Sequence, residues 1–166
     1  TSGIWFKQYS TFENVPLSGG PNVSNVGYGM LVGGDTALKE LKHGCQGYLT
    51  AYAAYNGSHQ NYDNVGVYQN GGALGLTGTL YKGNFYTALT ASAGDSSGEA
   101  HTMYGPDYFN TILAGLAWKS GYNIEFLRGK YILQPSFLAS YTFANTFDYT
   151  SASGVNITST PLNAFQ

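Results

Sequence analysis

Apolar and polar residues alternate with a period of two along several segments of the chain. Between Gly72 and Tyr81 the even positions carry Gly and Leu, whereas the odd positions carry Ala, Gly, Thr and Tyr. This alternation predicts a β-strand with one oily face and one small or polar face. Tyr131–Phe143 shows the same period, although Ile132 and Leu138 interrupt it. Further strand signals, some of weaker period, lie at 4–12, 26–33, 46–55, 85–93 and 111–118.

The expected connections are of two kinds that take turns along the chain. The short connections contain several charged residues and lie at 39–44, 82–84 and 120–129. The long connections are polar and lie at 13–25, 56–71, 94–107 and 144–159. Such alternation indicates an up-and-down antiparallel sheet whose two ends face different surroundings. Outer-membrane barrels have short periplasmic turns and long extracellular loops, so the long loops are expected at the cell surface.

The predicted strands have the length and the low charge of membrane-spanning strands. At ~3.3 Å per residue and a tilt of about 45°, 10 to 13 residues cover a band of ~25 Å. Inside these strands the charged residues are Lys7, Asp35 and, near an end, Lys119. We therefore expect one all-β domain over residues 1–166, an up-and-down antiparallel transmembrane β-barrel of the outer-membrane type.

The number of strands predicts an incomplete barrel. Seven full strands are followed by an eighth, Thr160–Gln166, which is too short to cross a bilayer at ~9 to 11 residues. A barrel must close to satisfy its edges, so the natural protein is expected to continue beyond Gln166. The first residue, Thr1, has no start methionine or signal sequence before it, which indicates a processed or excised piece.

The amino-acid composition argues against several other classes of protein. Only 10% of the residues are charged and 23 are glycine, which disfavours coiled coils, charged disordered tails and helical bundles. Seven Lys and Arg residues and a net charge of −2 leave no basic surface for nucleic acid. The single Cys45 can form neither an internal disulfide nor a cysteine-based metal site.

Alternation also assigns side chains to surroundings. The residues expected to face lipid are Leu74, Leu76, Leu80, Leu133, Phe137 and Tyr141. The residues expected to face the lumen are Asp35, Thr77, Thr79, Gln134, Ser136 and Ser140. The aromatic residues expected at the membrane interfaces are Trp5, Tyr81, Trp118, Tyr122 and Tyr131.

The polar residues of the expected turns and loops indicate no catalytic or metal site. The three histidines, at positions 43, 59 and 101, have no serine and acid at the spacing of a hydrolytic triad. Asp95, Glu99 and Asp107 offer oxygen ligands, but their spacing matches no calcium-loop template, so a solvated loop is expected. The carboxylate of Asp35 is expected to form hydrogen bonds in the lumen. We expect no enzyme activity, no metal and no cofactor.

Three strands resemble those of the autotransporter β-domain, the translocator of type V secretion. The opening GIWFKQY at Gly3–Tyr9 is similar to the family's first strand, and VGYGMLVGGDTAL at Val26–Leu38 to its glycine-rich second strand. YILQPSFLASYTF at Tyr131–Phe143 resembles a later strand that carries an apolar-x-Pro motif. Because family members have about twelve strands, the resemblance covers about the first two thirds of the domain.

The resemblance implies a membrane anchor and conduit. Family barrels are inserted by the barrel-assembly machinery, and the upstream passenger emerges at the cell surface. The expected partners are therefore outer-membrane lipid, that machinery and the chain's own passenger, with no nucleic acid.

Two other functions remain open from the sequence. One is a soluble, secreted β-sandwich or adhesin-type binding module, in which the apolar face is an internal core and the loops bind carbohydrate. The other is a small porin-like barrel without a passenger.

Overall fold

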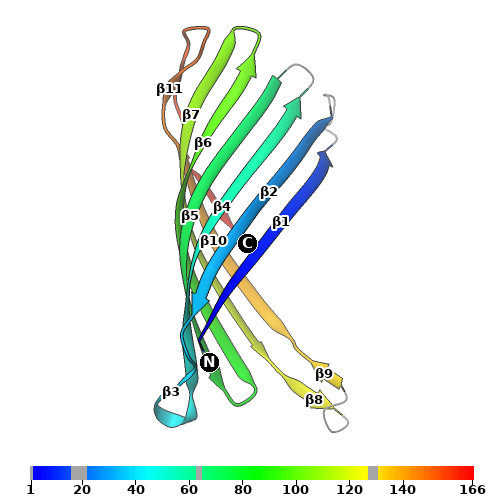
Figure 1. Ribbon diagram of the computed structural model, residues 1–166, viewed down its shortest axis with the longest axis vertical. Coiled ribbons are helices and arrows are strands. Elements are labelled where there is room, and N and C mark those ends of the chain that lie inside the picture. Colours follow the sequence, from blue (N-terminus) through cyan, green and yellow to red (C-terminus); the bar gives the residue numbers. More distant parts are fainter. Residues whose placement is uncertain (1, 16–21, 63–64, 127–130) are drawn as a thin grey trace.

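A computed structural model describes residues 2–15, 22–62, 65–126 and 131–166 (Figure 1). Within these ranges no helix is both long and apolar enough to cross a membrane. The strands are β1 (Gly3–Val15), β2 (Val23–Asp35), β3 (Lys39–Glu40), β4 (Gln46–Tyr62), β5 (Val65–Lys82), β6 (Phe85–Thr102), β7 (Gly105–Tyr122), β8 (Ile124–Phe126), β9 (Tyr131–Leu133), β10 (Ser136–Thr146), β11 (Tyr149–Thr150), β12 (Asn156–Ile157) and β13 (Leu162–Phe165). A short 3₁₀ turn, Lys42–Gly44, precedes β4.

Eight of these strands form one curved, twisted sheet in the order β1-β2-β4-β5-β6-β7-β10-β13 (Figure 1). Every neighbouring pair along this path is antiparallel. The short β3 pairs with β4, and two small hairpins, β8-β9 and β11-β12, lie outside the main sheet. The up-and-down antiparallel fold predicted from the sequence is therefore confirmed. In the described part of the chain β1 and β13 do not pair with each other, so the sheet is open.

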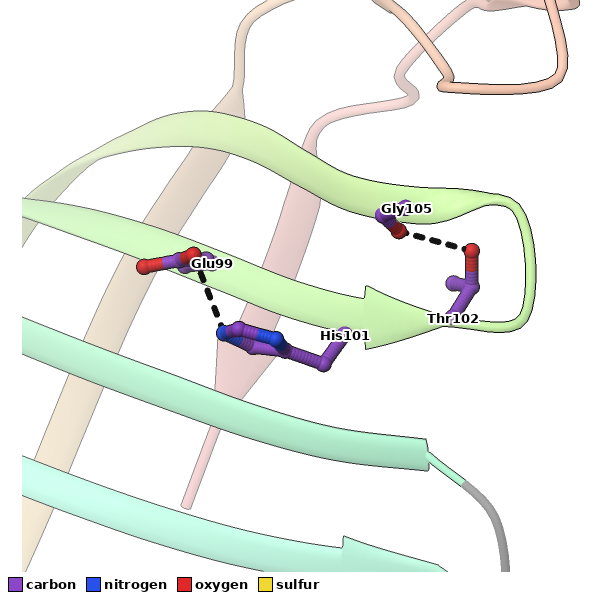
Figure 2. Close-up of polar contacts among 4 residues, drawn as sticks. All are labelled: Glu99, His101, Thr102 and Gly105. Carbon is purple, nitrogen blue, oxygen red and sulfur yellow. Dashed lines mark hydrogen bonds and ion pairs between the residues drawn. The ribbon is translucent and has the colours of Figure 1, made fainter.

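Two tight turns set the register of the three central strands. Gly83 and Asn84 join β5 to β6, and Gly83 has φ +57°, a left-handed backbone angle that glycine adopts without strain. Met103 and Tyr104 join β6 to β7 at the opposite end of the sheet. There the hydroxyl of Thr102 donates to the carbonyl of Gly105 across the turn, at 2.9 Å (Figure 2).

Two of the four expected long connections are wrong. Most of 56–71 belongs to β4 and β5, and 94–107 is divided between β6 and β7 around the turn at 103–104. Polar and glycine-rich residues in these segments lack apolar alternation, yet their backbones pair in full register. Because both faces of the sheet are polar there, the pattern on which the strand prediction relied is absent. Residues 16–21 of the connection expected at 13–25 and residues 63–64 lie outside the described residues.

The strand expected over 131–143 is also wrong as one element. It is broken at Gln134 and Pro135 into β9 and β10. Pro135 has no N–H to donate to a ladder, whereas its carbonyl accepts from the N–H of Tyr122 at 3.1 Å. The connection expected at 120–129 contains the end of β7 and all of β8, and its residues 127–129 lie outside the described residues.

Five aromatic side chains lie over glycines on one face of the sheet, which we call the inner face, and we call these five contacts the glycine–aromatic pairs. Tyr28 lies over Gly57 in the same way on the opposite face. The paired residues stand directly opposite each other on neighbouring strands. An added Cβ at any of these glycines would overlap the ring, so the rings use the space that a missing side chain leaves. The pairs are Trp5 with Gly33, Tyr9 with Gly29, Tyr52 with Gly75, Tyr86 with Gly121 and Phe109 with Gly98.

The pairing of Tyr52 with Gly75 predicts a strong effect of Gly75→Val. A valine there must displace the ring of Tyr52, and such overpacking costs about 1 to 3 kcal/mol of the free energy of unfolding. Gly72→Val, on the opposite face of β5, is the matched control because its nearest neighbour is the Ala54 carbonyl at 3.8 Å. Urea unfolding of the purified protein in detergent measures the difference. Equal stability of the two variants would contradict the packing role of Gly75.

Candidate functional site

The face opposite the glycine–aromatic pairs, which we call the outer face, is apolar and uncovered. Leu74 is 68% exposed, Leu76 53% and Phe137 56%, although their neighbours on the same face are also apolar. Among the described residues Val23 is the only buried hydrophobic residue, so no ordinary core is present. Exposed apolar area of this extent marks a surface that meets a membrane or another protein.

The apolar part of the outer face is nearly as tall as the apolar band of an outer-membrane barrel. On β6 it runs from Phe85 to Ala93 and ends at Asp95. On β5 it runs from Leu80 to Leu74, with Lys82 just beyond. At ~3.3 Å per residue and a tilt of ~45°, the nine positions on β6 cover about 20 Å, close to the ~25 Å apolar band of outer-membrane barrels.

Aromatic residues mark both borders of this band. At one border the indole N–H of Trp118 donates to Thr87 Oγ1 at 2.9 Å, and the Trp118 ring meets Phe137 edge to face at 5.6 Å. At the other border the hydroxyls of Tyr28 and Tyr55 both donate to Asn70 Oδ1, at 3.1 and 3.0 Å. Such amphipathic rings suit a boundary between hydrocarbon and water. Tyr28 and Tyr55 are not among the interfacial residues predicted from the sequence, although Tyr28 alternates in step with Val26 and Met30.

The inner face carries small and polar side chains that bond to one another across strands. Thr77 and Thr90 share a hydrogen bond of 2.8 Å, as do Thr111 and Thr146 at 2.9 Å. Asp35 accepts from the hydroxyl of Thr50 and from the indole N–H of Trp5. The register places the two groups expected to face lipid and lumen on opposite faces of β5: Leu74, Leu76 and Leu80 lie on the outer face, and Thr77 and Thr79 on the inner one.

The other predicted positions fall into three groups. On β10, Phe137 and Tyr141 lie on the outer face, and Ser136 and Ser140 lie opposite them. The sequence predicts one spanning strand that contains Tyr131, Leu133 and Gln134. In the structure Tyr131 and Leu133 belong to β9, which pairs with β8 outside the main sheet, and Gln134 is in no strand. Of the predicted interfacial aromatic residues on the main sheet, Trp118 and Tyr122 lie on the outer face, whereas Trp5 and Tyr81 lie on the inner face.

Beyond the apolar band, β4 to β7 extend as a polar sheet. Here His59 stacks on Tyr68 with ring centroids 4.1 Å apart, and Tyr68 meets His101 edge to face at 5.6 Å. The Nε2 atom of His101 lies 3.0 Å from a carboxylate oxygen of Glu99 (Figure 2). The sequence predicts these residues in loops, because no apolar alternation marks the two strands here.

The acidic residues considered for calcium do not converge. Asp95 and Glu99 lie on the outer face of β6, whereas Asp107 lies on the inner face of β7 and accepts from the N–H of Ala152 at 2.5 Å. Within the described ranges no three His, Cys, Asp or Glu residues are grouped as metal ligands would be.

This geometry is that of a wall of an outer-membrane-type β-barrel, with an apolar outer face and a polar inner one. Two solved structures have the same fold: the translocator domain of the autotransporter NalP from Neisseria meningitidis and the β-domain of the Bordetella autotransporter BrkA. The TM-scores are 0.77 and 0.75, each at 16% sequence identity and over 99% of this chain.

The likeness confirms the resemblance as one of fold. The chain spans 57% of the NalP domain and 67% of the BrkA domain. No protein-family model and no curated protein sequence matches it.

The polar extension predicts a shifted tyrosine titration. The charge of Glu99 disfavours the phenolate of Tyr108 and raises its pKa above the ordinary 10.0. Glu99→Gln is therefore expected to lower the pKa of Tyr108, so that the phenolate forms at lower pH. Alkaline titration followed by ¹³C-tyrosine NMR, with Tyr108→Phe to assign the signal, measures this. Asp95→Asn is the control, and an unchanged Tyr108 titration in Glu99→Gln would contradict the interaction.

Proposed function

We propose that this chain forms part of an outer-membrane translocator barrel, which anchors an N-terminal passenger and exports it to the cell surface. One observation carries the proposal. From Leu74 to Leu80 on β5 the outer face carries exposed leucines separated only by Gly78, while Thr77 and Thr79 of the same strand lie on the inner face. Such a face is stable in hydrocarbon, and the strands between β1 and β13 have their backbones paired on both sides, as hydrocarbon requires.

The inner face suits a water-filled passage. Its threonines and serines, and the carboxylate of Asp35, can bond to water or to a polypeptide that passes through the lumen. The likeness to two translocator domains of autotransporters favours this role over a porin-like barrel without a passenger. The proposed partners are outer-membrane lipid, the passenger and the barrel-assembly machinery, and the role requires no catalytic residue.

The strand extensions support an orientation. The polar sheet that carries His59 and Glu99 would stand outside the bilayer for about 18 Å, given eight further residues of β6 at ~3.3 Å and a tilt of ~45°. We propose that this end is the cell-surface end. Residues 147–161, the long connection from β10 to β13 that contains the β11-β12 hairpin, leave the sheet at the same end (Figure 1).

A soluble β-sandwich requires a second sheet over the apolar face. In the described part of the chain one main sheet is present, and the other two sheets are two-stranded hairpins. The outer leucines therefore lack the protein partner that a sandwich core would supply.

Membrane fractionation of the intact protein tests the proposal. The protein is expected in the outer-membrane fraction, and it should leave that fraction only with detergent because its apolar face needs a hydrocarbon partner. Washing with high salt or alkali is the control for peripheral attachment. A protein that stays monomeric in plain buffer would overturn the proposal in favour of the soluble module.

Substitution of Leu76 tests which face meets lipid. Leu76→Lys places an amine near the middle of the apolar band, where a lysine costs ~2 to 4 kcal/mol in outer-membrane barrels. Thr77→Lys, one residue along β5 on the inner face, is the matched control. Insertion is measured as the fraction of protein that is folded and embedded in the outer membrane. We expect a marked loss for Leu76→Lys alone, and an equal loss in both variants would contradict the assignment.

A further inference from the structure

A groove with a volume of about 460 Å³ opens on the outer face at the end that carries the Gly83–Asn84 turn. Four leucines line it: Leu41 from the segment that returns to β4, Leu49 from β4, Leu80 from β5 and Leu89 from β6. Lys39 of β3 also lines it. The volume is within the ~300 to 1,000 Å³ typical of small-molecule sites.

Two glycines create the groove. Gly78 stands between Leu49 and Leu89 in one row across three strands, so the apolar surface has a notch one side chain wide. At Gly47 the methyl carbons of Leu41 and Leu80 fill the space that a side chain would take, and they lie 3.3 and 2.8 Å from where a Cβ would be. The segment at Leu41 therefore leans over the sheet and gives the groove a wall that a flat barrel surface lacks.

The charges beside the groove are positive. Lys39 stands opposite Gly47 and shares the outer face, and Lys82 lies two residues beyond Leu80 on the same face of β5. The described carboxylates on the outer face of the main sheet, Asp95 and Glu99, lie at the far end of β6. Glu40, next to Lys39, is in register with Gln46 and shares the inner face. An apolar groove beside two amines suits a ligand with an apolar chain and an anionic head.

We propose that the groove holds an acyl chain of one anionic glycerophospholipid, with its phosphate at the amines of Lys39 and Lys82. The inference rests on the proposed function, because the outer face must lie in a membrane. The groove is continuous with the apolar band at Leu80 and Leu89, so a chain can enter it from the bilayer. The two amines attract a head with a net negative charge more strongly than a zwitterionic head, because the cation of the zwitterionic head offsets the charge of its phosphate.

Gly78→Leu tests the groove directly. A Cβ at Gly78 would lie 3.6 Å from the nearest methyl of Leu49, an ordinary contact, so the variant can fold while its side chain fills the groove. Gly72→Leu is the matched control, since it adds the same side chain to the same face of β5 outside the groove. A second variant, Lys39→Gln with Lys82→Gln, removes the charges and leaves the apolar lining.

The measurement is native mass spectrometry of the intact, membrane-extracted protein titrated with phosphatidylglycerol or phosphatidylcholine. We expect one phosphatidylglycerol to bind preferentially. Its apparent affinity should fall about tenfold or more in Gly78→Leu and in the double lysine variant, and it should be unchanged in Gly72→Leu.

Three results would overturn the proposal. If Gly78→Leu binds phosphatidylglycerol with wild-type affinity, no acyl chain enters the groove. If only the double lysine variant loses affinity, the lipid is held by charge at the surface and the groove is not used. Equal binding of both lipids would leave the groove to detergent, bulk lipid or another protein. Each of these results leaves the proposed function standing, because the protein used has already been extracted from membranes. Its absence from membranes would instead overturn the proposed function.

Discussion

The antiparallel backbone ladder is the constraint on which the rest of the structure depends. Side chains alternate between the two faces of a strand, so one register decides the surroundings of every residue in the sheet. A slip of β5 by one residue would turn Leu74 and Leu76 inward and Thr77 outward. In hydrocarbon no water is present to form hydrogen bonds with a free N–H or carbonyl, so these groups must bond to a neighbouring strand. The same pairing therefore satisfies the backbone and separates oil from water.

The glycine–aromatic pairs hold that register from the inner face. Tyr52 fits over the sheet only where a glycine stands opposite, and a shift of one residue would bring Leu74 or Leu76 against it in place of Gly75. The same holds for Trp5 over Gly33 at the first pair of strands. Because these five contacts are on the inner face, they leave the leucines of the outer face exposed.

How much the sequence could predict depends on the surroundings of each segment. The strand around Leu76 was predictable because one of its faces is apolar and the other is not, so the period of two is visible. The segments around His59 and Glu99 were not, because both faces of the sheet are polar there and the backbone alone makes the strand. Trp5 and Tyr81 are of the residue types that are common at membrane interfaces, but only the register shows that they lie on the inner face.

The two ends of the sheet differ, although not in the way the connection lengths predicted. At one end Lys39 and Lys82 lie beside the last leucines of the outer face, where an anionic lipid head could meet them. At the other end the strands continue past the apolar band, and Glu99, His101 and Tyr68 replace the leucines. Side chains on paired strands are held in place by the backbone hydrogen bonds between the strands. Side chains on loops have no such hydrogen bonds to fix their positions. The side chains of the strands therefore make the two ends of this sheet different, whatever the lengths of the connections.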